Sequence, residues 1–199
     1  IGAIAGIVLG NNIGGGNKGR NKVIGAVAGA AIGGAVGYSM DNQAKEVAQS
    51  LNTNVNNNPT AALDPNQDLI VSNTDNYVKI MFRDDMMFET NSENPTYAAG
   101  TKIAKITTVL QKYPNTLVQV VGHTDSRGTH AYNLALSEKR ATNVGNIINS
   151  TGVQNQIFSK GCSFDKPIAL NNSDANMGLN RRVEVYLYPN QQSVIDVCR

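Results

Sequence analysis

The side chains that could do chemistry are densest between residues 122 and 141. The first part, GHTDSRG from Gly122 to Gly128, is typical of a strand end that runs into a turn. The second part, from Tyr132 to Ala141, has helical periodicity. Within that helix Arg140 falls at about 340° when Asn133 is set to zero, inside the apolar arc. An arginine on a buried face needs a partner.

Two interpretations of Arg140 follow from its position. In the first, Arg140 pairs with Asp125 and closes the turn onto the helix, which is a structural role. In the second, the two opposite charges hold a ligand. The residues alone leave both interpretations open.

His123 could act as a base oriented by Asp125, because one residue separates them on a strand end and their side chains should point in much the same direction. No nucleophile stands at a recognisable spacing. We therefore expect a chain that is not an enzyme, with His123 as a structural hydrogen-bonding residue.

Metal ions, cofactors and nucleic acids are not expected ligands. The adjacent pair Asp84 and Asp85 has no further ligands in reach and is more typical of a solvated strand end. The net charge is +2, from 17 basic and 15 acidic side chains, and the chain has no tryptophan. Nucleic-acid binding usually needs a strongly basic balance.

Cys162 and Cys198 are the two cysteines of the chain, and no CxxC motif or histidine cluster accompanies them. A disulfide is expected if the chain resides in an oxidising compartment, and two inert thiols are the alternative.

The pattern from about residue 67 to residue 199 predicts one α+β domain. Leu69–Ser72 and Tyr77–Phe82 read as a hairpin, and Tyr97–Tyr113 reads as a helix that Pro114 ends. The remaining expected elements are a strand at Leu117–Val121, a helix from Ala131 to Asn149, and strands at Ile157–Cys162 and Arg182–Tyr188. We expect βαβ character, a final hairpin, and one buried face in the last strand, where Val183, Val185 and Leu187 alternate with polar residues and tyrosines.

Residues 1–41 have small residues at four-residue intervals, which predicts two glycine-zipper helices in a hairpin that associates with a membrane. The stretch Val23–Tyr38 is shorter than the roughly 20 residues that span a bilayer comfortably. A packed oligomer, an integral membrane partner contacted through residues 1–38, or an interfacial hairpin with a lipid anchor remains open. Residues 42–66 are rich in Asn and Pro and predict a polar linker.

The run from Gly122 to Ala141 resembles the defining motif of the OmpA/Pal/MotB-type peptidoglycan-binding domains. Gly161, Pro167, Asn171 and the run NRRVE from Asn180 to Glu184 are similar to the tail of that motif, and the resemblance covers roughly residues 68–188. One departure is Cys162-Ser163, where the family more often has a second glycine. The resemblance implies a βαβαβ-type mixed sheet with two main helices.

The same resemblance implies the roles of individual residues. Asp125 would take the ammonium of meso-diaminopimelate in the peptidoglycan stem peptide, and Arg140 would take its carboxylate. Asn133 could add a hydrogen bond, and free backbone N–H groups near Thr129–Ala131 could favour the carboxylate. Arg181 shares strand parity with Val183 and could support the site, with a surface salt bridge as the alternative. Arg182 would face the other way with Glu184, with a surface salt bridge expected.

A glycine-zipper segment before such a domain resembles the YiaD-type outer-membrane lipoproteins. We therefore expect a non-catalytic tether at the outer membrane, with the domain in the periplasm. One rival is a component of an oligomeric membrane assembly that this domain fixes to the wall, as in flagellar stators. A second rival is a cell-wall hydrolase.

Overall fold

The structure, a computed structural model, describes residues 35–199. The expected glycine-zipper hairpin therefore lies outside the described residues, apart from its last few positions. The elements are α2 (Ala35–Ser50), η1 (Ala61–Leu63), β1 (Leu69–Asn73), β2 (Val78–Arg83), α3 (Asp84–Met87), α4 (Tyr97–Leu110), β3 (Leu117–His123), α5 (His130–Ser150), β4 (Ile157–Gly161), α6 (Asp174–Asn180), β5 (Arg182–Tyr188) and η2 (Gln191–Ser193). Within residues 35–199, no helix combines the length and the apolar character needed to cross a membrane.

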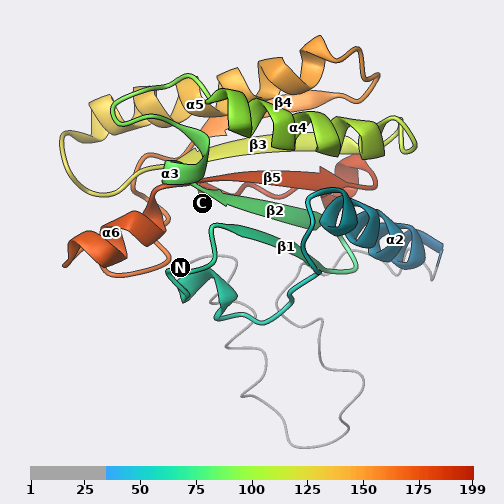
Figure 1. Cartoon of the computed structure of the whole chain (residues 1–199), viewed down its shortest axis with the longest axis horizontal. Coiled ribbons are helices and arrows are strands. Elements are labelled where there is room, and N and C mark those ends of the chain that lie inside the picture. The colour runs from blue at the N-terminus through green and yellow to red at the C-terminus, as the bar shows by residue number, and fades with distance from the viewer. Residues whose placement is uncertain (1–34) are drawn as a thin grey trace, which may run out of the picture.

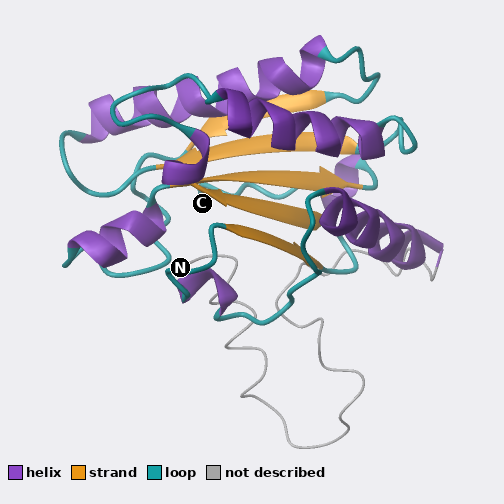
Figure 2. Ribbon diagram, in the orientation of Figure 1, coloured by secondary structure: helices purple, strands orange, loops and turns teal. Residues whose placement is uncertain are grey.

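The five strands form one mixed sheet with the order β1-β2-β5-β3-β4 (Figure 2). The expected hairpin is present, because β1 and β2 pair in antiparallel register. β3 and β4 are parallel and are joined through α5, which confirms the βαβ character and the α+β class. The expected final hairpin is wrong, since β5 does not pair with β4. It lies between β2 and β3 and is antiparallel to both.

Three helices, α2, α4 and α5, cover one face of this sheet (Figure 1). α4 and α5 each begin at a threonine whose side chain accepts a backbone N–H of the first turn, which satisfies a donor that the helix leaves free. The main core lies between these helices and the sheet. Its strand residues are Val71, Val78, Ile80, Phe82, Val118, Val120, Val183, Val185 and Leu187.

α2 occupies part of the segment that the sequence predicts to be a polar linker. Met40, Ala44 and Val47 on this helix are at most 2% exposed and belong to the main core. Gln43 donates to Thr116 Oγ1 at 3.0 Å. The apolar residues of α2 recur at helical spacing and form a stripe along one side of the helix. The polar residues between them hid this stripe in the sequence. The expectation of a linker is therefore wrong for residues 42–51, and a domain boundary at residue 67 would leave a buried helix outside the domain.

The chain after β5 covers part of the other face of the sheet, and η1 covers another part at β1 and β2. All seven residues of β5 are buried, although one buried face was expected. On this second face, Tyr186 and Tyr188 pack with Val121 and Cys162 beneath Val194, Ile195, Val197 and Cys198. The alternating pattern of β5 thus separates two buried environments rather than a core from solvent.

Candidate functional site

A cavity of about 360 Å³ lies at the end of the sheet where β3 ends and α5 begins. Four stretches that are distant in the sequence form its walls: α3 with the loop after it, the loop after β3, the first turns of α5, and the residue before β5. The lining residues are Asp84, Asp85, Phe88, Thr90, Asn91, Thr124, Asp125, Arg127, Tyr132, Asn133, Leu136, Arg140 and Arg181. The cavity therefore presents charges of both signs to whatever enters it.

Asp125 reaches the cavity from the loop after β3 and is only 5% exposed. Its Oδ2 accepts Nε and Nη2 of Arg127, at 3.1 and 2.7 Å, and Nη1 of Arg181 at 2.9 Å, whereas Oδ1 accepts the backbone N–H of Arg127 at 2.9 Å. Burial raises the pKa of Asp125, but the hydrogen bonds from Arg127 and Arg181 outweigh burial and hold the pKa below its usual value. Asp125 is thus an ionised acceptor whose Oδ1 keeps a lone-pair direction for a further donor.

Arg140 enters the same cavity from α5 and is 4% exposed. Its Nη1 lies 2.6 Å from Oδ1 of Asp84, and its Nε donates to the carbonyl of Ser92 at 3.0 Å. The guanidinium lies 4.6 Å from the centre of the Phe88 ring, which is a cation–π distance. The structural interpretation in which Arg140 pairs with Asp125 is therefore wrong, because Arg140 has its own acidic partner.

Asp84 is that partner, and the expectation of a solvated strand end is wrong for it. Asp84 is 9% exposed. Burial raises its pKa above the usual value, and the charges of Arg140 and Arg181 only partly offset this effect. The signal that could have found Asp84 is parity, since it follows Ile80 and Phe82 at two-residue spacing on the core face of β2. Asp85 has the exposed side chain that was expected.

Arg181 connects the two acidic groups of the cavity. Its Nη1 lies 2.9 Å from Oδ2 of Asp125, and its Nε lies 3.9 Å from Oδ2 of Asp84. Its side chain is 24% exposed, so it is only partly withdrawn from solvent. The structure thus places Arg181 inside the cavity, between the acidic partners of Arg127 and Arg140, rather than in an isolated surface salt bridge.

Asn133 lines the cavity and also shapes it. Its Nδ2 donates to the carbonyls of Arg127 and Thr129, at 2.8 and 3.2 Å, which ties the turn after β3 to the first turn of α5. Thr129 is the N-cap of α5, where its side chain accepts the N–H of Tyr132, and it is not among the lining residues. The structure therefore brings together Asp125, Arg140, Asn133 and Arg181, and leaves the exposed Thr129 outside the lining.

Close backbone packing sets the distance between α5 and the strands. Gly122 is the next-to-last residue of β3 and Gly161 is the last residue of β4. A β-carbon on either would collide with the main chain of α5 at Ser137 or Glu138. Ser163, in the loop after β4, has a φ of 48°, the left-handed conformation that a glycine adopts freely. Its N–H donates to Ser137 Oγ at 3.1 Å, and its hydroxyl donates to the carbonyl of His130 at 3.3 Å. The departure from a second glycine therefore leaves the tight loop in place.

Thr124 is a cavity residue that the sequence did not single out. It is 4% exposed, lines the cavity, and has a hydroxyl oxygen for which the described residues provide no hydrogen-bond partner. A buried hydroxyl normally forms a hydrogen bond. Its position directly before Asp125 was the available signal.

Two family models match this chain. Residues 87–181 match the OmpA family, and residues 1–41 match the glycine zipper 2TM domain. The chain carries an OmpA-like domain. The residues that line the cavity lie within the range matched to the OmpA family, except for Asp84 and Asp85.

Known proteins resemble the OmpA-like domain in sequence and in structure. Probable lipoprotein YiaD from Escherichia coli K12 is 36% identical over 103 residues, which are 51% of this chain and 47% of that protein. The peptidoglycan-associated lipoprotein of Buchnera aphidicola subsp. Baizongia pistaciae is 35% identical over 96 residues, 48% of this chain and 54% of its own. The chain thus spans about half the length of these relatives. The cell wall anchor of the T6SS from Pseudomonas aeruginosa superposes with a TM-score of 0.56 at 28% identity, over 61% of this chain and 88% of that one.

The OmpA-like domain also contains a second charged cluster, on the face of the sheet opposite the cavity. His123, Arg182 and Glu184 are each at most 4% exposed. Arg182 Nε lies 3.0 Å from Glu184 Oε1, and Tyr186 donates to Glu184 Oε2 at 2.8 Å. Arg182 therefore faces Glu184 as expected, but the pair is buried rather than at the surface.

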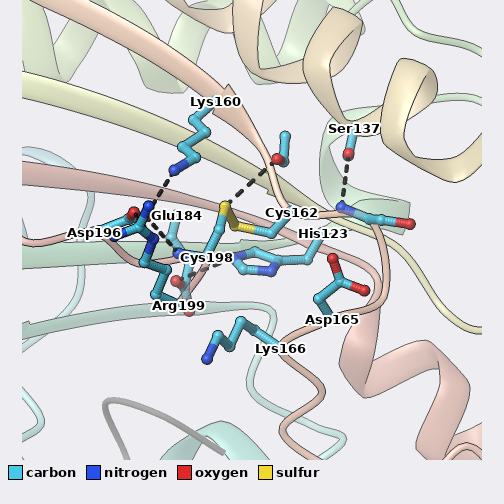
Figure 3. The surroundings of a disulfide bond; sticks show 12 residues. His123, Ser137, Lys160, Cys162, Asp165, Lys166, Glu184, Asp196, Cys198 and Arg199 are labelled. Atoms are coloured by element: carbon cyan, nitrogen blue, oxygen red, sulfur yellow. Dashed lines mark hydrogen bonds and ion pairs between the residues drawn. A yellow bond between two sulfur atoms is a disulfide. The ribbon is translucent and has the colours of Figure 1, made fainter. Parts of the chain in front are cut away.

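His123 does not share a direction with Asp125, because the chain leaves the strand after His123 and turns. Its Nε2 lies 3.4 Å from Glu184 Oε2 (Figure 3). Burial lowers the pKa of His123 to about 4, so its ring is neutral at pH 7. Burial raises the pKa of Glu184, but the charges of Arg182 and Lys79 outweigh it and hold that pKa well below the usual value. His123 and Glu184 thus belong to a structural network.

A disulfide closes the OmpA-like domain over this second cluster. Cys162, directly after β4, is bonded to Cys198 near the chain end (Figure 3). Asp196 adds an ion pair to Lys160 at 2.6 Å. The N–H of Cys162 donates to the carbonyl of Gly122 at 2.9 Å, and the N–H of Thr124 donates to the carbonyl of Ser163 at 2.9 Å. The covalent bond therefore holds the chain after β5 against the strand ends that carry the cavity.

Proposed function

We propose that this chain binds the stem peptide of peptidoglycan through the cavity, without catalysing a reaction, and tethers the outer membrane or a membrane complex to the cell wall. The observation that carries the proposal is the meeting of Asp125 and Arg140 in one cavity, each nearly buried and each with its own counter-charge. The relatives support the cell-wall assignment, since one is named a peptidoglycan-associated lipoprotein and one structure a cell wall anchor.

The free end of meso-diaminopimelate in a stem peptide carries both an ammonium and a carboxylate. Asp125 would accept the ammonium on Oδ1, where a lone-pair direction remains. Arg140 and Arg181 would donate to the carboxylate, because both already donate to carboxylates here and a guanidinium fits such a group with two parallel bonds. Thr124 would supply a hydroxyl. A zwitterion adds no net charge, so its binding leaves the net charge of the cavity unchanged.

The arrangement does not resemble a hydrolytic site. Within the described part of the chain, no histidine or cysteine lines the cavity. His123 lies on the opposite face of the sheet, neutral and enclosed. A hydrolase would need a nucleophile or a metal beside an acid–base pair. Incubating the protein with sacculi should therefore release no muropeptides, and their release would favour the hydrolase rival.

Sacculus pull-down tests the binding proposal. Asp125→Asn keeps the size of the side chain and removes its charge, and Arg140→Lys keeps the charge and removes the paired donors. Asp165→Asn is the matched control, because Asp165 is a half-exposed acid paired with His130 outside the cavity. We expect the two cavity variants to lose binding and the control to keep it. Retained binding by both cavity variants would contradict the proposal.

A competition experiment defines the ligand. Free meso-diaminopimelate should displace the protein from sacculi, and a derivative with an amidated carboxylate should displace it far less, because amidation removes the anion that Arg140 needs. Equal competition by the two compounds would contradict the assignment of Arg140 and Arg181 to the carboxylate.

A second candidate function is a part in an oligomeric membrane assembly that this domain fixes to the wall. The observation that favours it is the match of residues 1–41 to a glycine zipper 2TM domain, because small residues let helices pack closely in lipid. The mass of the protein extracted in detergent separates the two. A discrete oligomer favours the assembly, and a monomer favours the simple tether.

A further inference from the structure

One helix belongs to both parts of this chain. The glycine-zipper match extends to residue 41, and the described part of α2 starts at Ala35. The last residues of the zipper match therefore form the first turns of the helix that packs on the OmpA-like domain. The described part of this helix runs without a break from Ala35 to Ser50, so a flexible joint within residues 35–50 would have to interrupt it.

Side chains along α2 hold it in a fixed position on the domain. Met40, Ala44, Val47, Ala48 and Leu51, at the end of the helix, are buried in the main core. Polar contacts add to them: Glu46 accepts Nζ of Lys112 at 2.8 Å and the hydroxyl of Tyr113 at 2.9 Å. The axis of α2 is thus fixed relative to the sheet, and we call residues 35–50 the strut.

The strut contacts the end of the sheet that is opposite the cavity. Asp41 accepts a hydrogen bond from Asn73, the last residue of β1, and Gln43 donates to Thr116, directly before β3 begins. The cavity lies beyond the other end of β3. A seven-residue strand is about 20 Å long, so the two ends of the domain are about that far apart or more. Figure 1 shows α2 and α3 at opposite ends of the sheet, with the first turn of α2 directed away from α3.

We infer that α2 joins the membrane-associated segment to the domain without a flexible joint and so fixes how the domain faces the membrane. The end formed by the β1–β2 turn and the loop before β3 lies next to the lipid head groups, and the cavity faces away from them. This inference rests on the proposed attachment of residues 1–41 to a membrane. It adds that the domain itself, not a spacer, determines the reach from lipid to wall.

The test compares two labelled positions on the full oxidised chain bound to phospholipid vesicles with acceptor dyes on the head groups. Asn115→Cys places a donor dye on the exposed loop before β3, and Asp85→Cys places it at the cavity rim. We expect energy transfer from position 115 to be about twofold or more stronger, since the ends are about 20 Å or more apart. Equal transfer from both positions would overturn the inference.

An insertion tests the strut itself. Four residues, Gly-Ser-Gly-Ser, placed between Tyr38 and Ser39 should reduce the difference between the two labels, because the domain can then reorient. The same insertion at the exposed Gly152 turn is the matched control and should leave the difference unchanged. An unchanged difference after the Tyr38 insertion would overturn the inference.

Two further readouts separate this inference from the proposed function. Vesicle flotation reports membrane attachment, and a chain that does not float would overturn both the membrane half of the proposed function and this inference. Sacculus binding, measured without vesicles, reports the cavity alone. A chain that floats and binds sacculi but shows equal transfer would overturn only the inference.

Discussion

Two charged clusters lie back to back at the same end of the sheet, and they differ in access to solvent. In the cavity, Asp125 and Arg140 are nearly buried, but Arg127 is 58% exposed and Arg181 is 24% exposed. In the cluster beneath the chain end, the side chains of Arg182 and Glu184 are 3% and 5% exposed.

Each cluster pairs arginines with carboxylates, and the two clusters use residues that are neighbours in the sequence. Arg181 and Arg182 adjoin, and only Thr124 separates His123 from Asp125. Residue type therefore does not separate a binding site from a structural network here. We propose that access to solvent separates them. The partly exposed arginines of the cavity would be able to exchange a partner for a ligand, and the enclosed pair would not.

The largest expected difference is in stability. Glu184→Ala leaves Arg182 and Lys79 without their carboxylate in a buried place, and such a loss typically costs about 3–5 kcal/mol. Asp125→Ala should cost clearly less, because Arg127 and Arg181 can turn to solvent. Urea unfolding of both variants measures the difference. Equal losses would mean that the cavity cluster is as structural as the enclosed one.

The disulfide is the next test, since it holds the cover over the enclosed cluster. Replacing both cysteines by serine should lower the free energy of unfolding by about 2–4 kcal/mol, mainly because the unfolded chain is no longer cross-linked. Urea unfolding beside reduced and oxidised wild type provides the measurement. If the native protein labels with a thiol reagent at both positions without reductant, the disulfide is absent, and it does not hold the chain end over the enclosed cluster.

The enclosed cluster should also make stability depend on pH through His123. Its folded pKa of about 4 lies below the ordinary value of 6.5, so between these values the unfolded chain takes up a proton that the folded chain does not. Stability is therefore lost as the pH falls from 6.5 to 4, by about 2 kcal/mol at pH 5. His123→Gln should remove this contribution. The drop between pH 7 and pH 5, compared in the two proteins, measures it, and an identical drop would show that His123 is not the cause.

The smallest expected effect concerns ligand affinity. Losing one charge-assisted hydrogen bond in the cavity costs about 1.5 kcal/mol, which is about tenfold in affinity. Arg181→Lys should show this loss in sacculus titration while keeping the melting temperature. Arg182→Lys is the counterpart in the enclosed cluster, and it should lower the melting temperature while keeping the affinity of the folded protein. A reversal of these two results would exchange the roles of the clusters.

Local patterns predicted much of this fold. The hairpin of β1 and β2, the helix α5 and the inward position of Arg140 all follow from spacing within a few residues. The place of β5 between β2 and β3 does not, because it depends on pairing with strands far away in the sequence. The burial of α2 was missed because polar residues hid its apolar stripe, and because its partners Thr116 and Lys112 are more than 60 residues away.

The site shows the same limit. Asp125 and Arg140 were identified because a motif contains them, and Arg181 because of strand parity. Asp84 was missed, because the two adjacent aspartates were interpreted as one solvated pair and the parity of Asp84 with Ile80 and Phe82 was not used. The side chains of His123 and Asp125 were expected to point in much the same direction, but the chain turns after β3 and they belong to different clusters. Which acid pairs with which arginine depends on the tertiary fold rather than on local spacing.

The contact of Gly122 with the main chain of α5 has a consequence for how such a cavity can evolve. At this contact the spacing of α5 from β3 is set by the approach of two backbones rather than by a side chain. Exchanges at the rim, such as Thr90, Asn91 or Tyr132, can change which ligand enters without moving the walls. A β-carbon at Gly122 would instead push α5, and Arg140 with it, away from Asp125. Lineages can therefore diverge in ligand preference while the gap between the two charges stays constant.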